Sequence, residues 1–309
     1  MRIGTFQSYA SQTSRMADLQ TTLDKLQSQI AVGKRILDPS DDPLGANRVV
    51  SLQRSIDNNQ QYIRNMDFAT TQLSTADSAA ESMINQLTRA KELAVIASNG
   101  TMTATDRQNV STELDQLIKQ TLALANTQDS AGNYIFSGAR SSTAAFAQDA
   151  AGNILWQGGG DPPSVAVNAD VTVPSGANGL SMLSIDSAGG RQTILQALVQ
   201  FKTALDNPPL TPAAQPAFQQ AMDRALSDTS AGLDRLIDQR AVFGSRLAQI
   251  DSESERLKTL ETTLTTAQSS IESLDVAGAI TQLQSAMTLL QASQQSFTQI
   301  KKLSLFQYL

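Results

Sequence analysis

Residues 49–87 read VVSLQRSIDNNQQYIRNMDFATTQLSTADSAAESMINQL, and hydrophobic side chains recur along this stretch at alternating steps of three and four. Such spacing places them on one narrow face of an α-helix, as in the seam of a coiled coil. Three polar residues interrupt the seam, and polar residues at seam positions lower stability but fix the register. The stretch predicts a helix over about residues 45–98, roughly 80 Å long at 1.5 Å per residue, which we expect Asn99-Gly100 to end as a turn. The seam positions are Val49, Leu52, Ile56, Asn59, Ile63, Met66, Thr70, Leu73, Asp77, Ala80, Ile84 and Leu87.

A second seam lies nearer the N-terminus. Between Met16 and Leu37 the apolar residues again step by three and four, with one interruption at Gly33. The alternative is an ordinary amphipathic helix on a globular core, which would show a broader apolar stripe. The narrow stripe favours a coiled-coil-like partner. We expect it to provide an assembly seam at Leu19, Leu23, Leu26 and Ile30.

The segment Asp38-Pro39-Ser40-Asp41-Asp42-Pro43 separates these two helices. Proline disfavours helical geometry in the preceding residue and lacks the N–H that a helix interior needs, so we expect the first helix to stop here. Asp42 is expected to cap the next helix, with Pro43 at its first position. The carboxylates could alternatively form a calcium site, but the spacing of a calcium-binding loop is missing. We therefore predict a helix cap.

The middle of the chain changes character. Thr105-Asp106-Arg107-Gln108 has the spacing of a capping box and predicts a helix to about Asn126. Ten of the 17 glycines then fall between Gly132 and Gly190, a region that contains short β-prone runs. The runs at 133–138, 153–157, 164–167 and 170–174 predict a small β insert of four or five strands.

Helical periodicity returns after the insert. We expect a helix over about residues 192–205, a break at 207–212 and a long helix from about Ala213 to Leu274. At Asp275 the apolar pattern slips by two residues, which predicts a break there with Asp275 as the cap of a last helix. The assembly seam of this last helix is predicted at Ile280, Leu283, Met287, Leu290 and Phe297.

The predicted fold class is mainly α with a β insert, in which a long antiparallel helical rod with coiled-coil-like termini carries a small β-rich outer domain. A two-helix stalk buries too little apolar surface to offset its chain entropy. We therefore expect both ends to be poorly ordered in the free monomer and to become ordered in an assembly. The predicted segments are an N-terminal axial helix and loop (1–44), the two halves of the rod (45–132 and 191–274), the outer domain (133–190) and a C-terminal axial helix (275–309).

Composition narrows the possible functions. The 309 residues include no cysteine and no histidine, which removes disulfides, Cys/His zinc sites and imidazole-based catalysis. Neither a Gly-x-Ser-x-Gly nor a Gly-x-x-x-x-Gly-Lys motif occurs, so we expect no enzyme, no catalytic residues, no cofactor and no metal site. The net charge of -6 disfavours nucleic-acid binding. No apolar run is long enough to span a membrane and the N-terminus lacks the apolar region of a cleaved signal peptide, so no membrane partner is expected.

Two internal motifs are similar to those of bacterial flagellin and its junction relatives. Asp41-Asp42-Pro43-Leu44-Gly45 resembles the Asp-Asp-Pro-Ala-Gly motif that follows the first helix in the flagellin family. Arg240, Gly244 and Arg246 belong to a stretch that resembles Arg-x-x-x-Gly-x-x-x-x-Arg-Leu at the start of the family's C-terminal region, with one residue fewer before the second arginine.

The terminal sequences also carry the resemblance. The start Met1-Arg2-Ile3-Gly4-Thr5 and the ending Ser304–Leu309 are more similar to the junction members of the family than to flagellins. The segment Asn133–Gly138 is similar to a segment of those junction members, and Asp275-Val276-Ala277 resembles the opening of the family's last helix. In all, the likeness covers about residues 1–140 and 225–309.

This resemblance implies a structural axial protein of the bacterial flagellum, an adaptor ring that joins the hook to the filament. The implied partners are hook-associated protein 1, flagellin, further copies of the chain and a cytoplasmic export chaperone. The implied location is extracellular, at the hook–filament junction. A transient cytoplasmic stage would precede export by the flagellar type III apparatus.

Two other functions stay open on the residues alone. Flagellin or another axial filament subunit would share every seam described above and would differ in its terminal sequences. A cytoplasmic coiled-coil scaffold would also account for the seams, and its confinement to the cell lysate would distinguish it from an axial protein.

Overall fold

The computed structural model describes residues 2–99, 102–209 and 211–306, and the chain divides into two compact units. Unit 1 consists of Met1–Asn58 with Thr259–Leu309, and unit 2 of Asn59–Lys258. Three sequence predictions reach beyond the described residues. They concern Gly100 in the turn after residue 98, Met1 in the terminal motif and the last three residues of the ending.

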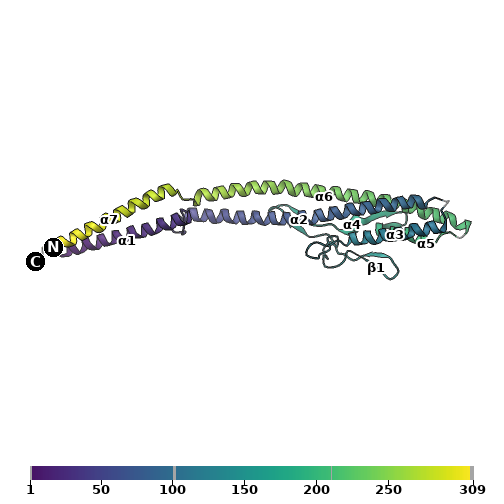
Figure 1. Ribbon diagram of the computed structural model, residues 1–309, viewed down its shortest axis with the longest axis horizontal. Coiled ribbons are helices and arrows are strands. Elements are labelled where there is room, and N and C mark those ends of the chain that lie inside the picture. The colour runs from purple at the N-terminus through teal and green to yellow at the C-terminus, as the bar shows by residue number, and fades with distance from the viewer. Residues whose placement is uncertain (1, 100–101, 210, 307–309) are drawn as a thin grey trace. The chain divides into compact units, whose positions relative to one another are not determined.

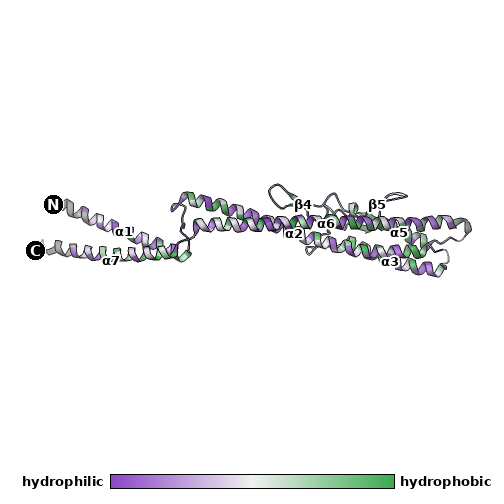
Figure 2. Ribbon diagram, turned by 90° about the horizontal axis from the view of Figure 1, so that it is seen from above, coloured by the Kyte–Doolittle hydropathy of each residue, from purple (hydrophilic) through white to green (hydrophobic). Residues whose placement is uncertain are grey.

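Unit 1 is built on two helices that run antiparallel to each other. α1 (Arg2–Val32) and α7 (Val276–Phe306) lie side by side (Figure 1). At one end the rings of Tyr9 and Phe297 meet edge to face, with centroids 5.8 Å apart. At the other end the N–H of Leu274 donates to the carbonyl oxygen of Gly33 at 3.2 Å. Hydrophilic residues are interspersed along both helices (Figure 2), so each offers only a narrow apolar face to its neighbour.

The first helix ends at Val32, and the predicted end at Asp38 was wrong. Gly33 follows with a φ of 73°, in the left-handed region where a side chain costs roughly 1–2 kcal/mol. Its N–H donates to the carbonyl oxygen of Gln29 at 2.8 Å, which closes the last turn. Gly33 is thus the helix C-cap, and Leu37 belongs to the following loop and not to the seam.

The predicted caps of the second and the last helix are confirmed. α2 (Pro43–Ala97) begins at Pro43, and the Oδ1 atom of Asp42 accepts from the N–H of Gly45 at 2.9 Å. α6 (Gln215–Glu272) ends just before the predicted break. Asp275 then caps α7 by accepting from the N–H of Gly278 at 3.1 Å.

Unit 2 contains the later part of α2, the earlier part of α6, and the shorter helices α3 (Ala104–Ala125) and α5 (Ile194–Asp206). α2 and α6 run antiparallel, because Asn59 donates to the carbonyl of Leu257 while Asp77 pairs with Arg240. The polar seam residue Asn59 is buried, as a register-fixing residue should be.

The buried face of α2 in unit 2 is wider than the predicted seam. Several alanines join the predicted leucines and methionine, because further helices pack around α2 here and cover more than one narrow stripe. Ile63 and Ile84 lie at the margin of this face, half-buried. The buried hydrophobic positions of this cluster on α2 are Met66, Ala69, Leu73, Ala76, Ala79, Ala80, Met83, Leu87, Ala90, Leu93, Ala94 and Ala97.

The N-cap of α3 lies two residues before the predicted one. Thr103, and not Thr105, is the N-cap: its side chain accepts from the N–H of Asp106 at 3.2 Å. The Oδ2 atom of Asp106 in turn accepts from the N–H of Thr103 at 3.0 Å. A capping box usually carries Glu or Gln three residues after the N-cap, whereas here that residue is Asp106. The prediction therefore paired Gln108 with Thr105 instead. The predicted end of the helix near Asn126 is confirmed.

The insert consists of three antiparallel hairpins, each a two-stranded sheet, within the described residues. β1 (Phe146–Gln148) pairs with β2 (Ile154–Trp156), β3 (Ser164–Ala166) with β4 (Thr172–Pro174), and β5 (Ser184–Ser187) with β6 (Gly190–Thr193). The short helix α4 (Gly179–Leu183) precedes β5. The predicted strand at 133–138 forms isolated bridges only, and the sequence prediction missed β1, β5 and β6.

The hairpins share one hydrophobic core with the helices of unit 2. Phe136, Phe146 and Ile185 of the insert belong to the same buried cluster as Leu87 of α2 and Phe243 of α6. The predicted fold class, mainly α with a β insert, is confirmed.

Candidate functional site

The predicted N-terminal seam lies on the face of α1 that meets α7. Leu23 and Leu26 are buried there, and Leu19 and Ile30 are half-buried. These four residues therefore stabilise the α1–α7 pair within one chain. Their role in an assembly stays a prediction.

The predicted C-terminal seam divides between two faces of α7. Leu283, Leu290 and Phe297 are half-buried in the pair, whereas Ile280 and Met287 are 42% and 45% exposed. Each of these two residues follows a more buried alanine, Ala279 or Ala286, by one residue, or about 100° around the helix, so both lie on an edge of α7 beside the face that meets α1. α7 thus presents an uncovered apolar edge.

The loop after α1 is fastened to the break before α7; we call residues 33–42 together with 271–275 the loop clasp. Lys34 Nζ lies 2.9 Å from Glu272 Oε2, and the backbone N–H of Arg35 donates to the carbonyl oxygen of Glu272 at 2.7 Å. The guanidinium of Arg35 also donates to the carbonyl oxygen of Ile271 at 3.1 Å. These bonds join the two helix breaks of unit 1, one between α1 and α2 and the other between α6 and α7.

Asp41 closes the loop clasp on the side of α1. Its Oδ1 atom lies 2.6 Å from Lys25 Nζ, and its Oδ2 atom accepts from the N–H groups of Leu37 and Asp38 at 3.1 and 3.3 Å. The Lys25 ammonium, followed by these backbone donors, lowers the pKa of Asp41 below its ordinary value.

Asp42 combines its cap with an ion pair. The N–H of Gly45, followed by the guanidinium of Arg35 at 3.0 Å, lowers the pKa of Asp42. A Cβ at Gly45 would lie 2.5 Å from Asp42 Oδ2 and 2.8 Å from Ile36 Cδ1. Gly45 therefore allows the cap and the loop to close over the start of α2. The motif residues Asp41, Asp42, Pro43 and Gly45 build this one local structure.

The motif residues of α6 act in unit 2. Arg240 makes a two-pronged ion pair with Asp77 of α2, at 2.8 and 3.1 Å. Arg246 donates to the carbonyl oxygen of Gly176 in the insert at 3.2 Å, and burial lowers the pKa of this arginine. Gly244, the third motif residue, is exposed and would have no atom within 4 Å of an added Cβ.

Lys25, Arg35 and Glu272 contribute to the loop clasp, and sequence reasoning did not single them out. Their charges alone gave no signal, because charged residues on helix faces are usually solvated. Arg35 and Ile271 lie 236 positions apart, and only the antiparallel α1–α7 pair brings them together.

The carboxylates that the motifs gather serve as caps and ion-pair partners. Over residues 2–99, 102–209 and 211–306, no three acidic side chains come close enough to hold a metal ion together. A membrane-crossing helix would need a longer apolar stretch than any helix in these ranges contains.

Known proteins resemble the chain over nearly its whole length. The bacterial flagellin N-terminal helical region matches residues 3–141, and the bacterial flagellin C-terminal helical region matches residues 226–309. Flagellar hook-associated protein 3 of Escherichia coli (strain K12) is 30% identical over 319 residues, which cover 99% of each chain. The chain belongs to the flagellar hook-associated protein 3 family. The family member of Salmonella typhimurium is 27% identical over 317 residues, again with 99% of each chain covered.

Similarity to flagellins is secondary. The flagellin of Listeria monocytogenes is 25% identical over 274 residues, or 88% of this chain and 85% of that one.

Solved structures show the same fold. Flagellar hook-associated protein-3 from Legionella pneumophila has a TM-score of 0.66 with 15% identity, over 72% of this chain and 98% of that one. FlgL of Xanthomonas campestris has a TM-score of 0.65 with 18% identity, over 71% and 99%.

Proposed function

We propose that the chain is a structural axial protein of the flagellum, an adaptor ring between the hook and the filament, and not an enzyme. The observation that carries this proposal is the full-length similarity to two flagellar hook-associated proteins 3, which exceeds the similarity to the flagellin of Listeria monocytogenes in both identity and coverage. The partners we assign are hook-associated protein 1 on the hook side, flagellin on the filament side and neighbouring copies of the chain.

The uncovered edge of α7 supports a role in assembly. Ile280 and Met287, one heptad apart on the same edge, are 42% and 45% exposed, although exposed apolar residues are normally scattered on a monomer. Packing against neighbouring subunits would remove this edge from water. The interface energy would also offset the conformational entropy lost when the α1–α7 pair becomes ordered. A lone pair of helices buries too little apolar surface to offset that loss by itself.

The same edge provides a reason for an export chaperone. An apolar helical edge that is exposed before assembly promotes premature association. We assign its protection to a cytoplasmic partner that binds α7 until the chain leaves through the flagellar type III apparatus. The protein would then reside outside the cell, at the hook–filament junction.

The deciding experiment combines a deletion strain with fractionation of sheared flagella. We expect the intact chain as a minor component of the sheared fraction. The deletion strain should keep its hooks and release flagellin into the medium. Release of hook-associated protein 1, or loss of the hook, would contradict the junction role. A band that makes up most of the filament mass would identify a filament subunit instead, and confinement to the lysate would identify a cytoplasmic scaffold.

A further inference from the structure

The insert contains an internal repeat with an offset of 20 residues. QDSAGNYIFSG at 128–138 and QDAAGNILWQG at 148–158 share their Gln, Asp, Ala, Gly, Asn and final Gly. Both copies fold into the same loop. Asp129 Oδ1 accepts from the N–H groups of Ala131 and Asn133, and Asp149 Oδ1 accepts from those of Ala151 and Asn153, all at 2.8–2.9 Å.

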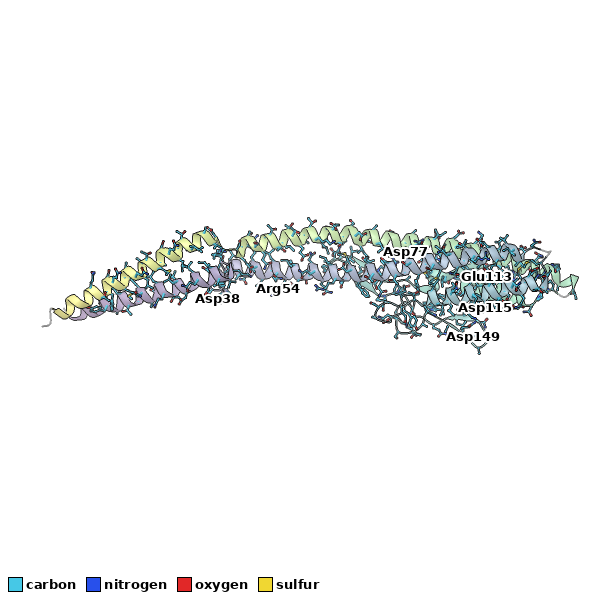
Figure 3. All side chains as sticks on the ribbon, viewed as in Figure 1. Asp38, Arg54, Asp77, Glu113, Asp115 and Asp149 are labelled. Carbon is cyan, nitrogen blue, oxygen red and sulfur yellow. The ribbon has the colours of Figure 1, made fainter. Side chains whose placement is uncertain are left out.

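The two copies differ in what covers them. In the first copy, Gln72 of α2 donates to Asp129 Oδ2 at 2.7 Å, and Ile135 and Phe136 are buried. In the second copy, the corresponding Leu155 is 48% exposed. Asp149 accepts only from its own loop among the described residues and points away from the helices (Figure 3). The first copy is therefore packed within the chain, whereas the second copy leaves Leu155 and Asp149 exposed to solvent.

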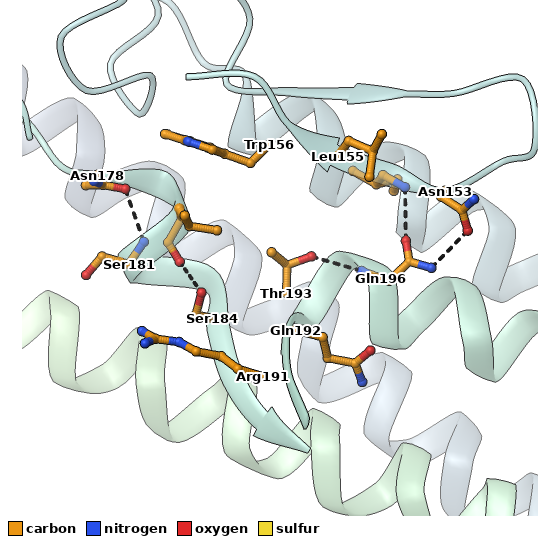
Figure 4. A pocket seen from close by; sticks show the side chains of 12 residues that line it. Asn153, Leu155, Trp156, Asn178, Ser181, Ser184, Arg191, Gln192, Thr193 and Gln196 are labelled. Atoms are coloured by element: carbon orange, nitrogen blue, oxygen red, sulfur yellow. Dashed lines mark hydrogen bonds between the residues drawn. The ribbon is translucent and has the colours of Figure 1, made fainter. Parts of the chain in front are cut away.

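Beside the second copy lies a groove of about 620 Å³, shown in Figure 4. Leu155, Trp156 and the 39% exposed Leu180 supply its apolar walls. The indole of Trp156 is held in place, since its ring contacts that of Phe146 with centroids 5.2 Å apart and a Cβ at Gly158 would lie 2.4 Å from Trp156 Cζ2. The groove thus has a preformed wall.

One charged side chain along this groove has no ion-pair partner among the described residues. Arg191 is exposed and forms no ion pair with a carboxylate of the described chain, although Asp186 lies opposite it in the β5–β6 hairpin. The other polar side chains along the groove are bonded internally. Gln196, for example, accepts from the N–H of Ile154 and donates to Asn153 Oδ1. A partner for this groove should therefore combine an apolar side chain with a carboxylate.

A surface with that combination exists on α6. Ile237 is 54% exposed and Val242 is 38% exposed, while Asp234 and Asp238 beside them are exposed and form no ion pair in the described chain. The exposed apolar pair on α2, Val95 and Ile96, follows Lys91 by about one helical turn and would bring a like charge to Arg191. Charge complementarity favours α6.

Gly244 is an independent feature of the same region of α6. A glycine inside a helix costs roughly 0.5–1 kcal/mol relative to alanine. Gly232 on the same helix is required within the chain, because a Cβ there would lie 2.8 Å from Ile194 Cγ1. Gly244 meets nothing in its own chain, so its small size is useful only to something outside the chain.

We propose that the groove formed by Leu155, Trp156, Leu180 and Arg191 binds the face of α6 that carries Asp234, Ile237 and Asp238, from a second copy of the chain. Groove and face are different surfaces, so the contact is heterologous and repeats head to tail around a ring or along a helix. The inference rests on the proposed function in one respect, which is that copies of the chain assemble with each other.

The test uses the absence of cysteine from the chain. Leu155→Cys and Ile237→Cys are introduced into separately tagged full-length chains, which are mixed at increasing concentration and oxidised. We expect disulfide-linked heterodimers. Val95→Cys in place of Ile237→Cys is the matched control and should give few. Arg191→Glu in the first chain should lower the heterodimer yield roughly fivefold, and Asp238→Arg in the second chain should restore it.

Three results would overturn the inference: equal yields with Val95→Cys and Ile237→Cys, homodimers of Leu155→Cys alone, or no heterodimer at any concentration. The proposed function is tested separately by the presence of the unmodified chain in sheared flagella. A chain found there that gives no heterodimer would contradict the groove contact alone. Heterodimers from a chain that is absent from flagella would contradict the junction role alone.

Discussion

The helices of units 1 and 2 have similar heptad sequences, but their apolar faces are covered to different extents. In unit 2, Phe136, Phe146 and Phe243 are fully enclosed, because among the described residues five helices and three hairpins surround one core. In unit 1, α1 and α7 cover only one face of each other, and Met287 stays 45% exposed. A heptad seam is sufficient for helix pairing, but a closed core needs elements on several sides of each helix. We therefore expect unit 2 to be stable in the free chain and unit 1 to gain its stability from assembly.

The largest expected effect comes from breaking the seam of unit 1. Leu283→Asp or Leu290→Asp places a charge in the α1–α7 contact and should abolish incorporation into the flagellum, because a desolvated charge without a partner is not tolerated in a packed seam. Motility in soft agar and the chain's band in sheared flagella measure the loss. Gln291→Asp, at an exposed neighbouring position, is the matched control. Normal motility of the Leu290→Asp strain would contradict the role of the seam.

A core substitution in unit 2 should act on stability alone. Phe243→Ala removes a fully buried ring and should lower the free energy of unfolding by about 3–5 kcal/mol. The single tryptophan, Trp156, lies in unit 2 and reports its unfolding in denaturant by fluorescence. Leu290→Ala should leave this transition within about 0.5 kcal/mol of the wild type, as expected for distant sites. If both substitutions shift it equally, the two units do not differ as described.

Asp41 and Asp42 of unit 1 should respond to pH in the opposite direction from Asp228 of unit 2. The folded-state pKa values of Asp41 and Asp42 are lowered by their partners, so their contribution to stability is present above pH ~4 and is lost as the pH falls through the lower folded values. In unit 2, burial raises the pKa of Asp228, against hydrogen bonds from Ser187 and Gln192 and the charge of Arg224. The contribution of Asp228 to stability is therefore lost as the pH rises from ~4 through that raised pKa, whereas carboxyl groups of unit 2 with lowered pKa values, such as Asp129 and Asp206, act in the opposite direction.

Asparagine substitutions separate these contributions. Asp228→Asn should stabilise unit 2 at neutral pH, as measured by its Trp156 transition, and should have a smaller effect below pH ~4, where the wild-type carboxyl group is protonated. Asp42→Asn should weaken unit 1 at neutral pH and have little effect below pH ~4, where the wild-type carboxylate is protonated. Circular dichroism at several pH values measures the second change. A destabilised Asp228→Asn protein at pH 7 would show that its hydrogen bonds outweigh the cost of burying the charge.

The smallest effect is expected at the glycines of α6. Gly244→Ala should raise the stability of unit 2 by about 0.5–1 kcal/mol, because it improves helix propensity and meets no neighbour. Gly232→Ala should lower it, since the new Cβ would clash with Ile194. Thermal unfolding of the two variants measures both signs. A destabilised Gly244→Ala protein would mean that this face of α6 is covered within the chain.

Several helix starts and caps were predicted from the sequence, because they depend on residues close together along the chain. Pro43 starts α2, Asp42 and Asp275 cap their helices, and the long periodic stretches are helical. The errors also have local reasons. Gly33 ends α1 earlier than predicted, since its backbone is left-handed. The prediction missed this end because it followed the apolar spacing past the glycine. The three-residue strands at Phe146–Gln148 and elsewhere are too short to show an alternating pattern.

The candidate site was predictable only in part. Leu23, Leu26 and the motif residues Asp41, Asp42 and Gly45 could be selected because each signal lies within a few positions along the chain. How far α1 would cover α7 could not, since Leu283 and Met287 fit the same heptad spacing although Leu283 is half-buried and Met287 is 45% exposed.

By itself the sequence determined the long helices, the caps at Asp42 and Asp275, the position of the β insert and the family, because these depend on side chains close together along the chain or on motifs preserved in order. Only the tertiary structure decided the pairing of Arg35 with the carbonyl of Ile271, of Arg240 with Asp77, and the difference in packing between the two copies of the repeat in the insert. Those contacts join residues far apart along the chain. Their partners are chosen by how helices and hairpins pack in space, which no local periodicity encodes.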